Sequence, residues 1–299
     1  MSDPSGPAAP LDVSGAPLSP VVPYVDPERI AKVQRKARNN ITISVVSTVV
    51  FVAVLIGFIA SLPGWPAVQK QFFNPTDFKA SFPSVVEALW LNIRIFAVAE
   101  VLILILSLAI ALVRLSRVPW MLPIRAAATG YVDFFRGTPT LLVVYLLTFG
   151  VPQLQLPHVP NSAVFWATVS LVLSYSAYVS EVFRAGITSV HPAQQAAART
   201  LGLSNTQTMR YVVLPQAVRR VIPPLLNDFA SLQKDTALVS VVGPVEAMRA
   251  AENYANVNFN YTSFIVAALL FIALSLPVAR FTDRLMAKQR KKTSAGGAL

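Results

Sequence analysis

The chain has 299 residues, of which 54% are hydrophobic and only 13% charged, and this composition excludes an ordinary soluble domain. A net charge of +11 would suit nucleic-acid binding if the basic residues formed a patch, but they lie between apolar runs, so we expect no nucleic-acid partner. The absence of cysteine excludes disulfides and thiolate chemistry, and the two histidines, His158 and His191, are too far apart to suggest a metal site.

The first forty residues are polar and rich in proline, and the first long apolar run begins at Ile41. A cleavable signal peptide carries its apolar region close to the start of the chain, so we expect none here. Residues 1–40 are predicted to be a disordered, basic tail. An extra membrane helix and an outer loop are expected over 41–85, and a second basic tail over 285–299.

Six segments are apolar and long enough to cross a hydrocarbon core of about 30 Å, which takes roughly 20 helical residues. The run from Gly137 to Ser180 has no charged residue and is too long for one span, so the cluster of prolines at 152, 157 and 160 is expected to divide it into two. The fifth segment is broken and polar. The sequence predicts an all-α membrane protein whose six spans lie at about 41–62, 88–113, on either side of the proline cluster, 218–242 and 261–279.

Basic residues in the short gaps predict the orientation. Twenty of the 25 Lys and Arg residues lie before the first span, after the second, after the fourth and after the sixth, which is one side of a six-span arrangement. The opposite gaps hold only Lys70, Lys79 and Arg249. We therefore expect a multi-pass protein of the cytoplasmic (inner) membrane with both termini in the cytoplasm.

The gap between the fourth and fifth spans is predicted to hold two short helices. Pro192 suits a first helical turn, the run to Leu201 has high helix propensity, and Gly202 can adopt the left-handed turn that ends a helix. Ser204 and Gln207 have the spacing of a capping box, and Pro215 is expected to end or kink the second helix. This segment is either a surface for another protein, since Ala196, Ala197 and Ala198 allow close approach, or only a linker at the membrane surface.

Four motifs resemble one known family in the same order along the chain. The segment 197–204 reads Ala-Ala-Arg-Thr-Leu-Gly-Leu-Ser, and Val-Val-Leu-Pro-Gln follows at 212–216. Together they resemble the EAA loop of binding-protein-dependent ABC importer permeases. The segments at 131–139, 177–187 and 231–243 resemble the polar amino-acid subgroup, and the resemblance covers about 90–283.

The resemblance implies a permease core over 86–284 that uses the loop as a coupling helix, the contact for an ATP-binding subunit. The partners it implies are two ATP-binding subunits, a second permease, an extracytoplasmic substrate-binding protein and membrane lipid, with ATP and Mg used by the partner and no cofactor on this chain. Ala196 stands where the family usually has Glu, so a salt bridge from that position is absent. The expected coupling residues are Gln195, Ala196, Ala197, Ala198, Arg199, Gly202 and Leu203.

Ionisable residues inside a span are costly, at roughly 2.5–3.5 kcal/mol each for Asp, Lys or Arg, and each therefore needs a partner or a polar pathway. Lys234 and Asp235 belong either to a pathway between two permeases or to internal ion pairs. Glu100 needs a partner on another helix, and Glu181 has the helical spacing for an ion pair with Arg184. The candidate pathway residues are Glu100, Glu181, Lys234, Asp235 and Thr236.

An ion-gradient-driven secondary transporter of a small polar solute is the alternative function, since the broken fifth span would suit it. The two halves of the chain show no matching interrupted spans, which disfavours that alternative. A membrane-embedded enzyme is less favoured, because we find no catalytic Ser/His/Asp set or metal cluster. No Gly-rich loop followed by Lys-Ser or Lys-Thr occurs, so ATP hydrolysis is expected in a partner and not in this chain.

Overall fold

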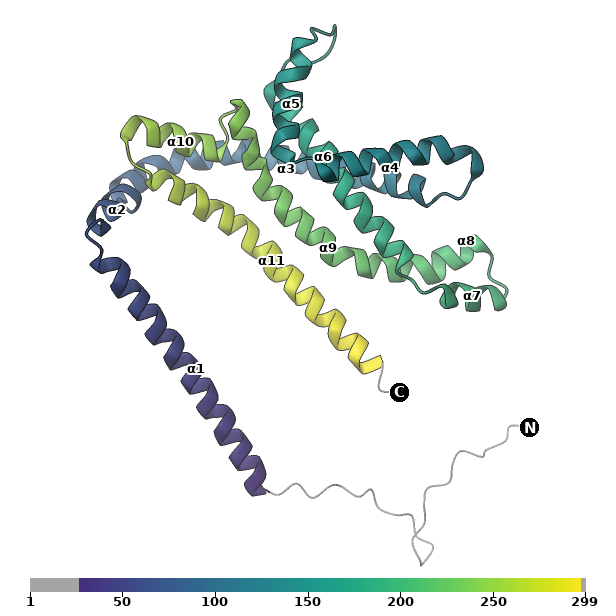
Figure 1. Ribbon diagram of the computed structural model, residues 1–299, viewed down its shortest axis with the longest axis horizontal. Helices are drawn as coiled ribbons and strands as arrows, with labels where there is room; N and C mark the ends of the chain where they lie inside the picture. The colour runs from purple at the N-terminus through teal and green to yellow at the C-terminus, as the bar shows by residue number, and fades with distance from the viewer. Residues whose placement is uncertain (1–26, 297–299) are drawn as a thin grey trace, which may run out of the picture. The chain divides into compact units, whose positions relative to one another are not determined.

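The computed structural model describes residues 27–296, and the remainder of the two expected tails, 1–26 and 297–299, lies outside the described residues (Figure 1). The chain divides into two units, Met1–Trp65 and Pro66–Leu299. The described part of the first unit is one helix, α1 (Pro27–Ser61), followed by a short turn. The expected disorder up to residue 40 is therefore wrong for 27–40, where the helix begins on a proline, a residue suited to a first turn.

The second unit is helical throughout its described elements. Two 3-10 segments, Pro119–Met121 and Thr236–Val242, and a π-helical segment, Met209–Val213, lie between its α-helices. The α-helices are α2 (Trp65–Phe72), α3 (Pro75–Leu115), α4 (Leu122–Gly137), α5 (Thr140–Gln153), α6 (Ala163–Thr188), α7 (Pro192–Thr200), α8 (Asn205–Thr208), α9 (Leu214–Asp235), α10 (Ala247–Asn258) and α11 (Thr262–Gly296).

The expected break within 137–180 is confirmed, but the third span differs from the prediction. The chain leaves the helix at Gln153 and re-enters one at Ala163. The helix before the break, α5, has only 14 residues, about 21 Å, and is too short to cross alone. It meets α4 at a 106° bend, because Thr138 and Pro139 are extended and proline cannot continue the hydrogen-bond ladder.

The predicted number of six spans is not confirmed. Four helical stretches within the described residues are long and apolar enough to cross a membrane, and the bent pair α4–α5 makes a fifth candidate. The expected fifth span, α9, does not qualify by composition, since it carries Arg219, Arg220, Asp228, Lys234 and Asp235. It nevertheless packs along α6 and α11, two of the candidate spans.

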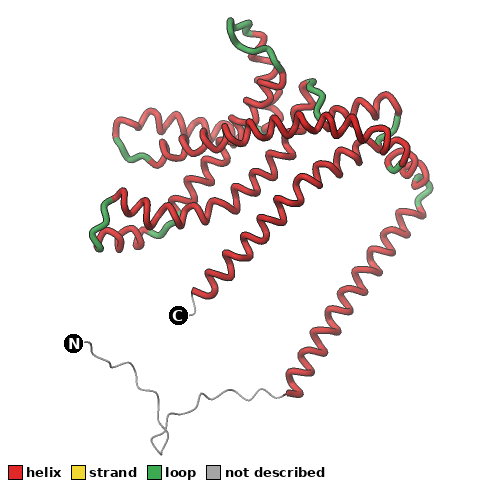
Figure 2. Tube along the Cα trace, turned by 180° about the vertical axis from the view of Figure 1, so that it is seen from behind, coloured by secondary structure: helices red, strands yellow, loops and turns green. Residues whose placement is uncertain are grey.

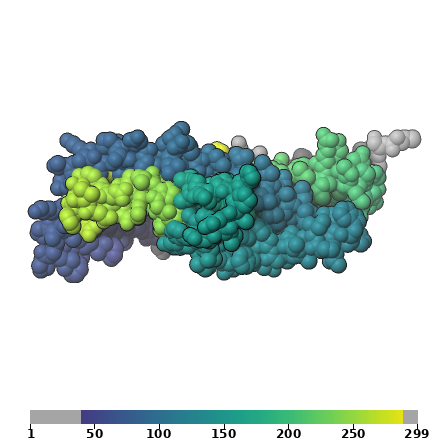
Figure 3. All heavy atoms as spheres, turned by 90° about the horizontal axis from the view of Figure 1, so that it is seen from above, coloured from purple at the N-terminus to yellow at the C-terminus, as the bar shows by residue number. Residues whose placement is uncertain are grey.

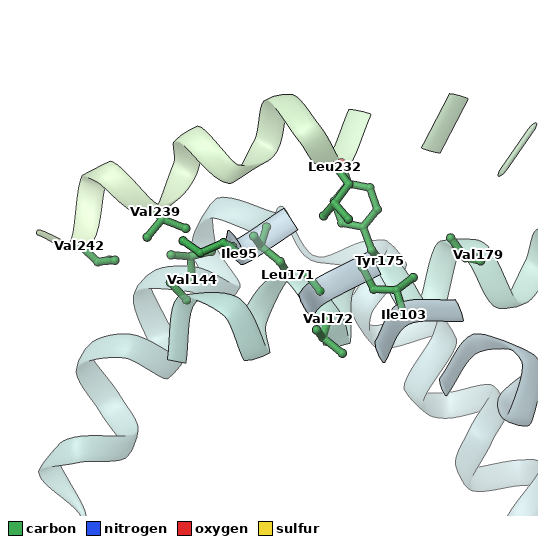
Figure 4. Close-up of a cluster of buried hydrophobic side chains, with 12 residues drawn as sticks. Ile95, Ile103, Val144, Leu171, Val172, Tyr175, Val179, Leu232, Val239 and Val242 are labelled. Atoms are coloured by element: carbon green, nitrogen blue, oxygen red, sulfur yellow. The ribbon is translucent and has the colours of Figure 1, made fainter. Parts of the chain in front are cut away.

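The largest buried cluster joins α3, α5, α6 and α9 (Figure 4). Ile95 and Ile103 of α3 meet Leu171 of α6 and Leu232 of α9 there, and all four side chains are buried. Phe96 and Phe229 pack edge to face between α3 and α9, with ring centroids 4.6 Å apart. These contacts fix α9 against the bundle although its sequence is polar for a membrane helix.

One end of the unit carries α7 and α8, and we call it the hairpin end; the other carries α10, and we call it the α10 end. The loop from α3 to α4 lies at the hairpin end (Figures 1 and 2). In the space-filling view, α10 and α5 stand out on one face, with α3 beside α10 (Figure 3).

A buried polar network holds α10 to the bundle. The fully buried Glu246 carboxylate accepts hydrogen bonds from Asn92 Nδ2 at 2.8 Å and from the backbone N–H groups of Met248 and Arg249 at 3.0 and 2.8 Å. The Asn92 side chain also accepts from Ala247 N at 3.0 Å. Burial raises the pKa of Glu246, while these hydrogen bonds act in the opposite direction.

Candidate coupling site and substrate pathway

The first helix of the predicted coupling segment forms as expected. His191 Nδ1 accepts from Ala193 N at 3.2 Å and caps α7, whose first turn holds Pro192. At the other end, Gly202 N donates to Arg199 O at 2.9 Å and Leu203 N donates to Ala198 O at 3.1 Å, which is a Schellman motif. Gly202 has φ +84°, so the left-handed turn predicted for it is confirmed.

The second helix begins as predicted and ends differently. Ser204 N donates to Gln207 Oε1 at 2.9 Å and Gln207 N donates to Ser204 Oγ at 3.3 Å, so the capping box is confirmed. Pro215 does not end the helix. The chain passes through a π-helical turn, in which Leu214 N donates to Met209 O, and continues into α9. Pro215 lies in the first turn of α9, where a backbone N–H is not required for the helix.

The hairpin formed by residues 191–214 has a mixed surface. Leu201, at its tip, is 81% exposed, and Tyr211, Met209 and Leu214 are exposed as well. Ala196 and Ala197 are exposed, but Ala198 is buried, so its expected place on the small-residue surface is wrong. Ala198 lies under the turn, where its carbonyl accepts from Leu203, and its side chain therefore faces inward.

Two side chains of α9 connect the hairpin to the bundle. The amide of Gln216 donates to Gln194 Oε1 of α7 and to Val212 O at 3.0 Å. The guanidinium of Arg220 donates to Ser189 O, in the link between α6 and α7. A displacement of the hairpin would therefore move the base of α9 and the end of α6 together.

The polar residues of α9 divide between two faces. Asp228 and Asp235, seven residues apart, point toward the bundle together with the buried Leu232. Asn227 and Lys234, also seven residues apart, are exposed. The ammonium group of Lys234 makes no ion pair with any described residue.

Carboxylates and a tyrosine gather where α3, α6 and α9 meet. The hydroxyl of Tyr175 on α6 donates to Asp235 Oδ2 at 2.7 Å. Glu100 on α3, half-buried, lies near Asp228 of α9, a like charge that repels it, and no stabilising partner of the kind expected for Glu100 is found among the described residues. Asp228 Oδ2 is buried and has no hydrogen-bond partner among the described residues.

Two of the candidate pathway residues lie in structural contacts. Glu181 forms ion pairs with Arg184, at 2.8 Å, and with Arg114 of α3, so the predicted pair is confirmed and a second arginine joins it. Thr236 is buried, donates to Gln233 O at 2.8 Å and accepts from Asn92 at 3.1 Å. The structure therefore brings Glu100 and Asp235 to the same helix junction and places Glu181 near the hairpin end.

Asp228 and Tyr175 are not among the pathway residues predicted from the sequence. Asp228 stands two helical turns before Asp235, and that spacing was a readable signal, because residues seven apart share a helix face. Tyr175 had no comparable signal, since only the packing of α6 on α9 brings its hydroxyl to Asp235.

Comparison with known proteins gives the family. Residues 120–291 match the model of the binding-protein-dependent transport system inner membrane component. The chain belongs to this family. It is the membrane-spanning permease component of such a system, a multi-pass inner-membrane protein, and members of the family work with ATP-binding and substrate-binding partners.

Individual relatives agree with that assignment. The arginine transport system permease protein ArtQ of Bacillus subtilis is 34% identical over 67% of this chain and 91% of its own length. The glutamate transport system permease protein GluC of Corynebacterium glutamicum is 34% identical over 69% and 96%. A crystal structure of an amino acid ABC transporter with histidines matches with a TM-score of 0.63 and 31% identity, over 69% of this permease and 94% of that chain.

Proposed function

We propose that this permease carries a polar amino acid into the cell, driven by ATP hydrolysis in a partner subunit that docks on the hairpin 191–214. The hairpin carries the proposal, because it is capped at both helices, fixed to α9 and α6 by Gln216 and Arg220, and exposes Leu201 at its tip. Exposed apolar side chains on a rigid element are typical of a protein interface.

The assembly proposed has two permeases, two ATP-binding subunits that use ATP and Mg, and one extracytoplasmic binding protein. The hairpin end and both termini face the cytoplasm in this arrangement, as the distribution of basic residues favours. Closure of the ATP-binding subunits would push the two hairpins and rock α9 and α6, which would open the permease to the two sides in turn.

The exposed face of α9 supports the pairing of two permeases. A lysine on a helix that packs among membrane spans cannot face lipid without a cost of roughly 3 kcal/mol. Lys234 is exposed and unpaired among the described residues, so a second permease or a water-filled pathway is its favourable surrounding. The proposed substrate pathway runs beside α9, with Lys234 on the exposed face of this helix and Glu100, Asp228 and Asp235 at its junction with α3 and α6.

A transport assay tests the proposal. The permease would be reconstituted into liposomes with its ATP-binding subunit and binding protein, and uptake of labelled amino acids would be followed with ATP inside or outside. We expect uptake only with ATP on the side that the hairpin faces, and no uptake driven by an ion gradient alone. Uptake that persists without ATP and stops when an ion gradient is removed would contradict it.

A further inference from the structure

A basic pocket lies at the hairpin end of the bundle, apart from the hairpin and from the pathway residues. It has a volume of about 460 Å³ and opens between the last turn of α3, the first turns of α4 and α6 about one turn before its end. Its lining residues are Arg114, Leu122, Arg125, Ala126, Thr129 and Arg184. Three guanidinium groups from three helices therefore meet around one opening.

The charges around this pocket do not balance. Glu181 is the carboxylate paired with Arg114 and Arg184, and among the described residues no acidic one lines the pocket. Arg125 is directed by a hydrogen bond from its Nη1 to Ser116 O at 2.8 Å, not by an acid. Two positive charges are left over, and each arginine has five N–H donors, of which these contacts use only a part. The pocket is thus suited to an anion.

The arginines are held in position before any anion binds. The side chain of Arg114 is only 12% exposed and that of Glu181 only 17%, so their ion pair is largely enclosed by protein. Arginine forks match the oxygens of a phosphate group, and donors fixed in advance lose little freedom on binding. A phosphate group is the anion that this arrangement fits.

The rim of the pocket points to the source of that phosphate. Leu122 lines the opening and is exposed, and Ile124 and Trp120 beside it are exposed too, Trp120 to 72%. Apolar side chains and a tryptophan around a basic site are typical of the level at which lipid headgroups meet the acyl chains. A soluble anion would gain nothing from such a rim.

We propose that the pocket binds the phosphate of an anionic phospholipid in the cytoplasmic leaflet. The proposal rests on the orientation given above, in which the hairpin end faces the cytoplasm. The bound headgroup joins α3, α4 and α6 at the point where α6 continues through Ser189 into the hairpin. The lipid would thereby stiffen the base on which the coupling segment stands.

Lipid binding is the test. The full-length permease with its ATP-binding subunit would be placed in nanodiscs of phosphatidylcholine containing a photoactivatable phosphatidylglycerol, and crosslinking at the pocket would be measured against lipid concentration. Arg125→Gln removes one guanidinium without touching the Glu181 ion pairs. Arg117→Gln, on an exposed arginine in the loop between α3 and α4, is the matched control. We expect Arg125→Gln to weaken phosphatidylglycerol binding about tenfold and Arg117→Gln less than twofold.

Three results would overturn the proposal. Equal losses of phosphatidylglycerol crosslinking in the two variants would mean that the lipid is attracted by general surface charge and not bound at a specific site. Equal crosslinking of a phosphatidylcholine probe would mean that the phosphate of an anionic lipid is not recognised. Displacement of the lipid by millimolar inorganic phosphate would assign the arginines to a soluble anion, and lipid crosslinking that appears only when the ATP-binding subunit is left out would assign them to a protein contact. Because lipid occupancy is measured and not uptake, failure here leaves the coupling proposal intact, and a failure of ATP-driven uptake would not change the measured lipid occupancy.

Discussion

At the scale of single residues, the two aspartates of α9 differ in their hydrogen bonding. Asp235 accepts a hydrogen bond from Tyr175, while Asp228 leaves one oxygen without a partner among the described residues. An ionised group that only held the fold would be expected to have its oxygens satisfied by neighbours. The incomplete pairing of Asp228 fits the proposed pathway, in which substrate or water would contact its free oxygen.

Asp235→Asn removes the negative charge but keeps the contact with α6, because the amide oxygen of asparagine can still accept a hydrogen bond from the Tyr175 hydroxyl. We expect initial uptake to fall by about tenfold, equivalent to about 1.4 kcal/mol, with the thermal unfolding midpoint nearly unchanged. Glu252→Gln is the control, since it removes a carboxylate from a half-exposed pair with Arg249. Uptake at the wild-type rate in both variants would remove Asp235 from the pathway.

At the scale of elements, the sequence predicts those helix ends and turns that depend on a few neighbouring residues. The break in the run 137–180 followed from prolines, and the hairpin followed from Gly202 and the Ser204 capping box, because these signals act within a few residues. The 106° bend between α4 and α5 and the π-helical turn before α9 were not predicted, since a proline marks a break in a helix, but the angle of a bend and the way one helix continues into the next depend on tertiary packing. The grouping of Glu100, Asp228 and Tyr175 depends on that same packing.

Gly186 tests the close contact between α6 and α9. A Cβ atom added there would lie 2.0 Å from Val221 Cγ2, and the branched valine cannot turn away freely. We expect Gly186→Ala to destabilise the protein by about 1–3 kcal/mol through overpacking, measured by unfolding in detergent. Gly130→Ala, in α4 with open space around it, should instead be neutral or slightly stabilising. Equal stability of the two variants would contradict the packing described.

Gly202 tests the turn of the hairpin independently of contacts. Apart from the glycine and its two chain neighbours, no described residue has an atom within 4 Å of an added Cβ atom, so any effect comes from the φ of +84°. Asn tolerates this conformation and Val does not. We expect Gly202→Val to lower binding-protein-stimulated ATP hydrolysis several-fold more than Gly202→Asn does. Identical stimulation in the two variants would show that the turn geometry is not used in coupling.

At the scale of the whole molecule, we propose that the permease is a passive bundle moved by an external ATP-binding subunit. Composition alone predicted a helical membrane protein, and the motifs predicted the family, which the comparisons confirm. The six crossings predicted from composition are not confirmed, because among the described helices α9 carries too many charges to qualify as a span and α5 alone is too short. Contacts with neighbouring helices hold α9 in the bundle despite its charges and α5 despite its short length.

Site-specific crosslinking tests the central claim most directly. The chain has no cysteine, so Ala197→Cys introduces a single thiol on the exposed side of α7, and Asn253→Cys introduces one at the α10 end as the control. In membranes that contain the ATP-binding subunit, we predict that a short thiol crosslinker joins position 197 to that subunit and leaves position 253 unjoined. Failure of position 197 to crosslink, or its labelling by a membrane-impermeant reagent from outside the cell, would contradict the account.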